Sequence, residues 1–80
     1  MQEVFIKTEY IKLGQALKQA GFAGSGTDAK FIIADGLVSV DGEPETRRGR
    51  KLFGGEVVTF DNGSEEQSFK VESVSEKQTY

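Results

Sequence analysis

The chain has 80 residues, enough for one small domain with a single hydrophobic core. It contains no cysteine and no histidine, which excludes disulfides, thiolate chemistry, imidazole general bases and the usual zinc sites. Its 13 Asp and Glu residues against 10 Lys and Arg give a formal net charge of -3, and with no membrane-length apolar run and no signal-peptide pattern we expect a cytoplasmic protein.

The first half of the chain predicts one strand and two short helices. Period-two alternation in EVFIK favours a strand over 3–7. The period then changes, and apolar residues at helical spacing predict a helix over 11–20 with Gly21 as its stop. A second helix is expected from the capping signature SGTD at 25–28 to Gly36. Helices this short are unstable alone, so both should pack on a sheet.

The second half predicts strands. They are expected over 37–43, 56–60 and 68–74. Dipeptides typical of tight turns mark the reversals, namely Asp41-Gly42, Gly54-Gly55 and Asn62-Gly63. This order predicts an α+β fold in which two short helices pack on one side of a small, mostly antiparallel sheet of four to five strands. Residues 1–74 are expected to form a single domain and 75–80 to fray.

A cationic segment, ETRRGRKL at 45–52, stands out in this acidic chain, because four of the five residues from 47 to 51 are Lys or Arg. Arginine favours bidentate phosphate contacts or stacking on bases. The cationic segment could attract phosphate although the whole chain is acidic, because the Debye length is about 8 Å at physiological salt and more distant charges are screened. The alternative is a solvated loop whose cations pair with Glu43, Glu45 and Glu56, and charge alone leaves both interpretations open.

The start of the second helix is a candidate anion site. Ser25, Thr27 and Lys30 lie at its N-terminus, and Lys18 is on the helix before it. A hairpin that brought 47–51 beside this terminus would complete one groove of positive potential. Phe31 is expected in the core, because Phe is usually buried, although an exposed Phe31 could stack on an unpaired base.

Catalysis is not indicated. Asp35, Asp41, Glu43 and Glu45 could pair as acid and base or hold a metal, but we interpret them as solvated turn and strand-edge charges. The glycine-rich GSGT at 24–27 could cradle a phosphate, yet it lacks the lysine and spacing of a P-loop. We therefore expect no enzymatic activity, no cofactor and no metal.

The segments LGQALKQAG, SGTDAKFIIADGLVSVDGE and ETRRGRKLFGGEVV resemble the S4 RNA-binding domain, or alpha-L motif, most closely its short free-standing bacterial form, the YaaA-like proteins. The similarity runs from about residue 10 to 58 and leaves a C-terminal hairpin, about 56–74, outside its most specific part. The resemblance implies a non-enzymatic protein that recognises structured ribosomal or transfer RNA through a groove between the second helix and the following hairpin.

Carried over by position, the resemblance implies RNA contacts by Ser25, Thr27, Lys30, Arg47, Arg48, Arg50 and Lys51, to which the charge argument adds Lys18. Two departures weaken the helix half of the site: Gly26 stands where many members have a basic residue, and Asp41 where an asparagine is common. The alternative function is a protein-interaction module that uses the sheet edge or the acidic C-terminal hairpin. We expect a monomer without a membrane partner.

Overall fold

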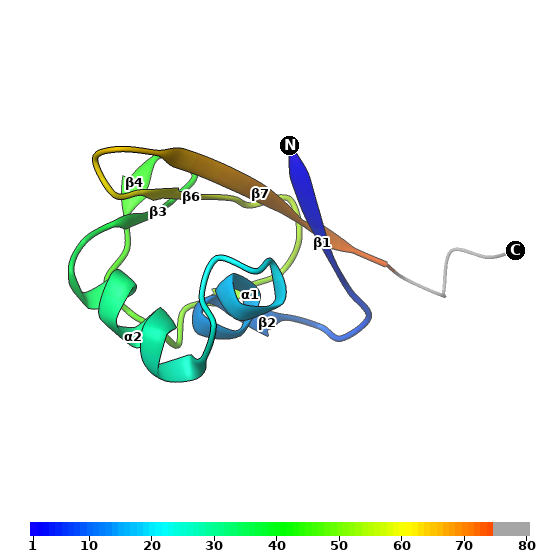
Figure 1. Cartoon of the computed structure of the whole chain (residues 1–80). Coiled ribbons are helices and arrows are strands. Elements are labelled where there is room, and N and C mark those ends of the chain that lie inside the picture. Colours follow the sequence, from blue (N-terminus) through cyan, green and yellow to red (C-terminus); the bar gives the residue numbers. More distant parts are fainter. Residues whose placement is uncertain (75–80) are drawn as a thin grey trace, which may run out of the picture.

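The computed structural model describes residues 1–74, and the expected fraying of 75–80 concerns residues outside that part. The N-terminal elements are β1 (Gln2–Ile6), β2 (Ile11–Lys12), α1 (Leu13–Gln19) and α2 (Gly26–Ala34). The strands that follow are β3 (Val38–Val40), β4 (Glu43–Pro44), β5 (Lys51–Leu52), β6 (Val57–Asp61) and β7 (Glu66–Ser73). Figure 1 shows the sheet as one layer, with both helices and β2 lying on the same side of it.

Five strands form the main sheet, in the order β1-β7-β6-β3-β4, and β2 and β5 form a separate two-stranded ladder. Strand β1 runs parallel to β7, whereas the other pairs of the main sheet are antiparallel. The predicted fold class, α+β with two short helices on a mostly antiparallel sheet, is therefore confirmed.

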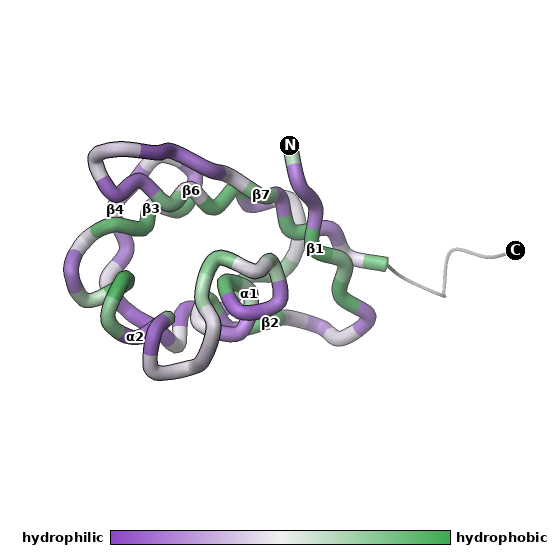
Figure 2. The backbone as a smooth tube through the Cα atoms, in the orientation of Figure 1, coloured by the Kyte–Doolittle hydropathy of each residue, from purple (hydrophilic) through white to green (hydrophobic). Residues whose placement is uncertain are grey.

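The core lies between the inner face of the sheet and the two helices. Alternation places Val4 and Ile6 inside and leaves Phe5 56% exposed, as the period-two pattern predicts. Figure 2 shows hydrophobic segments in the strands and in both helices, and hydrophilic residues where β7 begins. Phe22, in the loop after α1, meets the buried ring of Phe69 edge to face with centroids 5.3 Å apart, and so ties this loop to the sheet.

The hairpin between β3 and β4 turns as predicted. Asp41 and Gly42 both adopt positive φ, 53° and 88°, which is the signature of a type I′ turn. The reversal at Asn62-Gly63 also occurs, but it is a four-residue loop, because Asp61 pairs with Glu66.

Three local predictions are wrong. The first helix begins at Leu13, because Ile11 and Lys12 pair with Leu52 and Lys51 in the β2–β5 ladder. In the last strand, predicted over 68–74, Val74 lies beyond the end of β7 at Ser73 and is 39% exposed. Phe31 is 60% exposed, because α2 turns Ala29 and Ile33 toward the core, so its expected place in the core is not observed.

Leu52 anchors the cationic segment to the core, since it is fully buried although its neighbours in sequence are exposed. We predict that Leu52→Ala lowers the free energy of unfolding by about 2–5 kcal/mol, through lost burial and the cavity left behind. Urea unfolding followed by circular dichroism measures the change. Val74→Ala serves as the control, and an equal loss in both variants would contradict an anchoring role for Leu52.

Candidate nucleic-acid interface

The cationic segment is fixed to the first turn of α1 by backbone hydrogen bonds. The Leu13 N–H donates to the Arg50 carbonyl at 2.8 Å, and the Gly14 N–H donates to the Arg48 carbonyl at 3.0 Å. The first N–H groups of a helix have no partner within the helix, so these carbonyls satisfy groups that would otherwise need another acceptor. The sequence suggested a position beside the start of the second helix. In the structure the segment also docks on the first turn of α1.

Gly14 allows this close approach. A Cβ atom at this position would lie 2.6 Å from Cγ and 3.2 Å from Cδ of Arg48. The aliphatic stem of Arg48 thus crosses directly over the first turn of α1, where a methyl group would displace it. The position of the Arg48 side chain depends on the absence of a side chain at residue 14.

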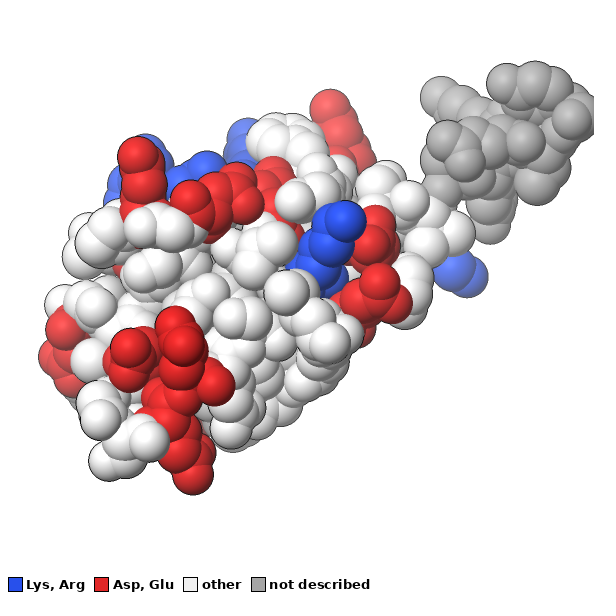
Figure 3. All heavy atoms as spheres, turned by 90° about the horizontal axis from the view of Figure 1, so that it is seen from above, with Lys and Arg blue, Asp and Glu red and all other residues white. Residues whose placement is uncertain are grey.

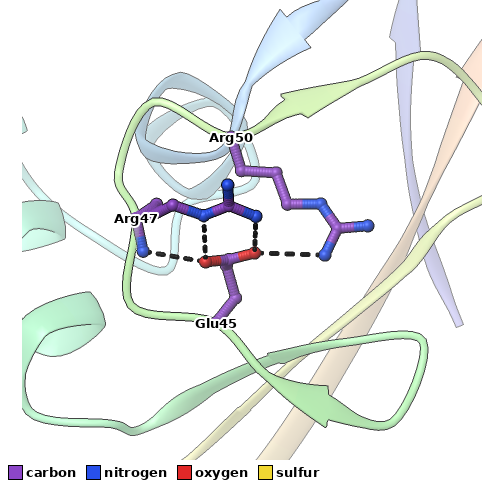
Figure 4. Close-up of polar contacts among 3 residues, drawn as sticks. All are labelled: Glu45, Arg47 and Arg50. Carbon is purple, nitrogen blue, oxygen red and sulfur yellow. Dashed lines mark hydrogen bonds and ion pairs between the residues drawn. The ribbon is translucent and has the colours of Figure 1, made fainter.

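Glu45 holds two of the arginines, as Figure 4 shows. Its Oε2 accepts hydrogen bonds from the backbone N–H and Nε of Arg47, both at 3.0 Å. Its Oε1 accepts from Nη2 of Arg47 and from Nη1 of Arg50, both at 3.1 Å. Because Arg47 donates to the charged form, and Arg50 adds to the effect against the opposing cost of burial, the pKa of Glu45 is lowered to about 2.

The ion pairs expected in the solvated-loop interpretation form for only part of the cationic segment. Glu45 is only 6% exposed, so it is not the solvated charge we expected, and it neutralises one unit of charge shared by two arginines. Glu56 does not pair with the cations, since its carboxylate accepts from the N–H groups of Phe53 and Gly54. Within residues 1–74, Glu43, Arg48 and Lys51 belong to no ion pair.

A groove of about 320 Å³ lies between α1, the start of α2 and the cationic segment. Its lining residues are Lys12, Gly14, Gln15, Lys18, Gly26, Arg48 and Gly49. Three of these are cations and none is acidic, so the potential in the groove is positive. An anion entering it would also meet the N-terminus of α2 at Gly26.

The predicted site residues are only partly brought together. Lys18 and Arg48 line the groove, and Arg47 and Arg50 are held beside it by Glu45. The remaining predicted residues, Ser25, Thr27, Lys30 and Lys51, do not line it.

The positions of those four residues explain why. The Ser25 hydroxyl accepts from the Asp28 N–H at 3.1 Å and so caps α2. Thr27 and Lys30 are exposed along α2, and Lys51 lies with its Nζ 4.8 Å from the ring centroid of Tyr10.

Sequence reasoning missed Lys12, which lines the groove. The helix predicted over 11–20 includes Lys12, whereas this residue precedes α1 and belongs to β2. The available signal was the alternation at both ends of the ladder, where Ile11 and Leu52 are buried and Lys12 and Lys51 are exposed. A two-residue strand is too short for that alternation to be noticed without its partner.

Charge is divided between the faces of the molecule. Figure 3, which views the sheet from outside, shows several groups of Asp and Glu on this face and Lys and Arg mainly at its rim. The loop and strand ends from Asp61 to Glu66 contribute exposed carboxylates here, and Lys70 is paired with Glu72 at 3.6 Å. The outer face of the sheet is thus unsuited to phosphate, in contrast to the groove.

The chain belongs to the S4 domain family, whose model matches residues 4–71. It is 47% identical over 58 residues to the "Probable ribosome maturation protein RlbA" of Bacillus subtilis (strain 168), which covers 72% of this chain and 82% of that protein. It is 43% identical over 54 residues to the "Putative RNA-binding protein YbcJ" of Escherichia coli (strain K12), with 68% and 77% covered.

A third relative is a much longer protein, of which this chain matches only a part. The "Small ribosomal subunit protein uS4m" of Schizosaccharomyces pombe is 38% identical over 53 residues, which is 66% of this chain and 16% of that protein. The expected resemblance to the S4 domain, and to its short free-standing form, is confirmed.

Residues 1–74 contain neither a metal-binding cluster nor a membrane-spanning helix. No three acidic side chains there lie together in a way that could hold a metal ion. No helix in this part of the chain has the length and apolar character needed to cross a membrane.

We predict that Gly14→Ala destabilises the protein relative to Gly26→Ala. Alanine stabilises an exposed helical site by about 1 kcal/mol over glycine, and a Cβ at residue 26 meets nothing within 4 Å. At residue 14 the same methyl group must displace Arg48, which should offset that gain. Urea unfolding of both variants measures the difference, and equal stabilities would show that Arg48 moves aside at no cost.

We predict that Glu45→Gln destabilises the fold by about 1–2 kcal/mol at pH 7, because two arginines lose a charged acceptor at a site open to solvent on one side. A lowered pKa means that ionised Glu45 stabilises the folded state above pH 4.5 and that this contribution disappears as the pH falls toward 2. Unfolding titrations of both proteins across this range should therefore converge at the acid end. Glu43→Gln is the control, and a difference at pH 2 as large as that at pH 7 would contradict the ionic role.

Proposed function

We propose that this S4-domain protein is a non-enzymatic, cytoplasmic RNA-binding protein that recognises structured RNA, ribosomal RNA above all, as a monomer. The observation that carries the proposal is the groove in which Lys12, Lys18 and Arg48 converge without a neighbouring carboxylate in its lining. Lys and Arg side chains neutralise phosphates and release counterions, which supplies binding energy independent of base sequence.

The geometry favours a folded RNA over an extended strand. A-form RNA presents a wide, shallow minor groove with phosphates and 2′-hydroxyls at its edges, and proteins read it mainly by shape. Docking on the first turn of α1 and the Glu45 ion pairs fix the backbone and the arginines before RNA arrives. Arg47 remains 75% exposed in its side chain despite its bonds to Glu45, so it is still accessible to a phosphate. Such prior ordering reduces the entropy lost on binding.

The relatives support the choice of RNA. One is named as a ribosome maturation protein, one as an RNA-binding protein and one as a protein of the small ribosomal subunit. The match to the S4 family model, over residues 4–71, includes the cationic segment. We extend the proposal to RNA contacts by Arg47, Arg48, Arg50 and Lys51, and by Ser25, Thr27 and Lys30 at the start of α2.

Binding to an RNA stem-loop should depend steeply on salt. For about four to six neutralised phosphates, the slope of log affinity against log salt should lie between about -3 and -5, and a rise from about 50 to 200 mM should cost about 10²–10³ in affinity. Arg48→Ala should reduce the slope by about one and weaken binding to all structured RNAs alike. Fluorescence anisotropy at several salt concentrations measures both quantities.

Lys70→Ala is the matched control. Lys70 alternates in β7 with the buried Phe69 and Val71, so it lies on the outer face of the sheet, and its removal should leave the affinity unchanged. A flat salt response, or equal losses in the Lys70 and Arg48 variants, would contradict the proposed groove. If the protein binds no RNA, the alternative function as a protein-interaction module is favoured. That function would require the acidic β6–β7 hairpin for capture of a basic partner.

A further inference from the structure

The β2–β5 ladder carries an electrostatic arrangement that folding alone does not explain. Its register sets Lys12 directly opposite Lys51, on the side away from the buried pair Ile11 and Leu52. Like charges directly opposite each other across a ladder destabilise it. Within residues 1–74, neither lysine belongs to an ion pair that would relieve the repulsion. An anion held between these two lysines would remove the cost.

Two aromatic rings flank the same side of the ladder. The rings of Tyr10 and Phe53 lie with centroids 5.9 Å apart at an interplanar angle of 57°, and Nζ of Lys51 lies 4.8 Å from the Tyr10 centroid. Phe53 is 51% exposed although it is a large apolar side chain. The carboxylate of Glu56 accepts from the Phe53 N–H at 2.8 Å and so fixes the backbone that presents this ring. Exposed aromatic rings beside cations are the usual platform for unpaired bases.

A second hollow, of about 620 Å³, lies beside the Tyr10–Phe53 pair and is contiguous with the basic groove. It lies between the β1–β2 loop and α1, and its lining includes Lys7, Thr8, Glu9 and Tyr10. Lys12 and Gln15 line both this hollow and the basic groove, so the two are contiguous at those residues. Its volume is within the range of small-molecule sites in proteins. Glu9 disfavours a phosphate in its own part of the hollow, but a carboxylate can accept from the amino group of a base.

We propose that this second hollow, with Tyr10, Phe53, Lys12 and Lys51, binds one unpaired nucleotide that leaves the structured RNA held in the basic groove. The base stacks on the exposed ring of Phe53 beside the half-buried Tyr10, its phosphate lies between Lys12 and Lys51, and Glu9 is available to a base amino group. The inference rests on the proposed function, because the nucleotide belongs to the same RNA. It assigns to the N-terminal segment 7–12 a preference for stem-loops that carry a single-stranded extension.

The test compares a blunt RNA stem-loop with the same stem-loop carrying a short unpaired extension. The unmodified protein should bind the extended RNA about tenfold more tightly or better, as expected for one stacked base and one added phosphate contact. The double variant Tyr10→Leu/Phe53→Leu keeps apolar volume but removes the aromatic faces. It should lose most of that advantage while its affinity for the blunt stem-loop stays the same.

Phe31→Ala is the matched control, since Phe31 is another exposed aromatic residue, and it lies on α2 and belongs neither to the hollow nor to the Tyr10–Phe53 pair. It should change the affinity for both RNAs by the same factor. Thermal melting verifies that each variant is folded, and Tyr10→Phe should retain the advantage, which separates stacking from the tyrosine hydroxyl.

The outcomes separate this inference from the proposed function. If the unmodified protein bound both RNAs with equal affinity, the proposed nucleotide site would be wrong, while RNA binding by the basic groove would be unaffected. Equal losses for both RNAs in the leucine variant would also overturn it. Failure of the unmodified protein to bind either RNA would overturn the proposed function and the platform together.

Discussion

The geometry of the candidate site depends on one set of contacts, the docking of the cationic segment on the first turn of α1. Two helix N–H groups bond to the carbonyls of Arg48 and Arg50, and the β2–β5 ladder continues the same junction. These bonds place four cations at the surface without using their side chains. The buried Leu52 secures the junction from inside, and Gly14 leaves room for the stem of Arg48. Charge is thus positioned by the backbone, while the side chains of Arg47 and Arg50 are held by Glu45 and that of Arg48 lines the groove.

Much of the fold could be predicted because its signals are local. Alternation, helical spacing, the cap at Ser25 and the Asp41-Gly42 turn each depend on neighbouring residues, and each appears in the structure. The β2–β5 ladder could not be predicted, since each strand is two residues long and is specified only by a partner far along the chain. The same reason explains why Lys12 was missed and why the contact of the cationic segment with the first turn of α1 was not foreseen. Phe31 was misplaced because residue type alone does not say which face of α2 is buried.

The negative net charge of the protein is compatible with a nucleic-acid ligand because the charges are separated in space. Acidic residues gather on the outer face of the sheet, whereas the residues within 1–74 that line the groove on the helical side include three cations and no carboxylate. At physiological salt, charges beyond about 8 Å are largely screened, so the groove retains its local potential. The acidic face then has a directional effect: it repels phosphate from one side of the molecule and leaves the groove as the favourable approach.

The ion pairs of Glu45 with Arg47 and Arg50 reduce the positive charge of the cationic segment but order its side chains. A buried carboxylate beside four cations lowers the charge available to phosphate, because the trio with Arg47 and Arg50 carries a net charge of only +1. In return, four hydrogen bonds to Glu45 fix both guanidinium groups and the turn between them. Long flexible side chains lose rotamer freedom when they bind, and that loss is reduced where they are already ordered. The site therefore has a weaker electrostatic attraction for phosphate but a fixed arrangement of guanidinium groups. Such an arrangement suits the proposed recognition of the shape of a folded RNA better than general attachment to any polyanion.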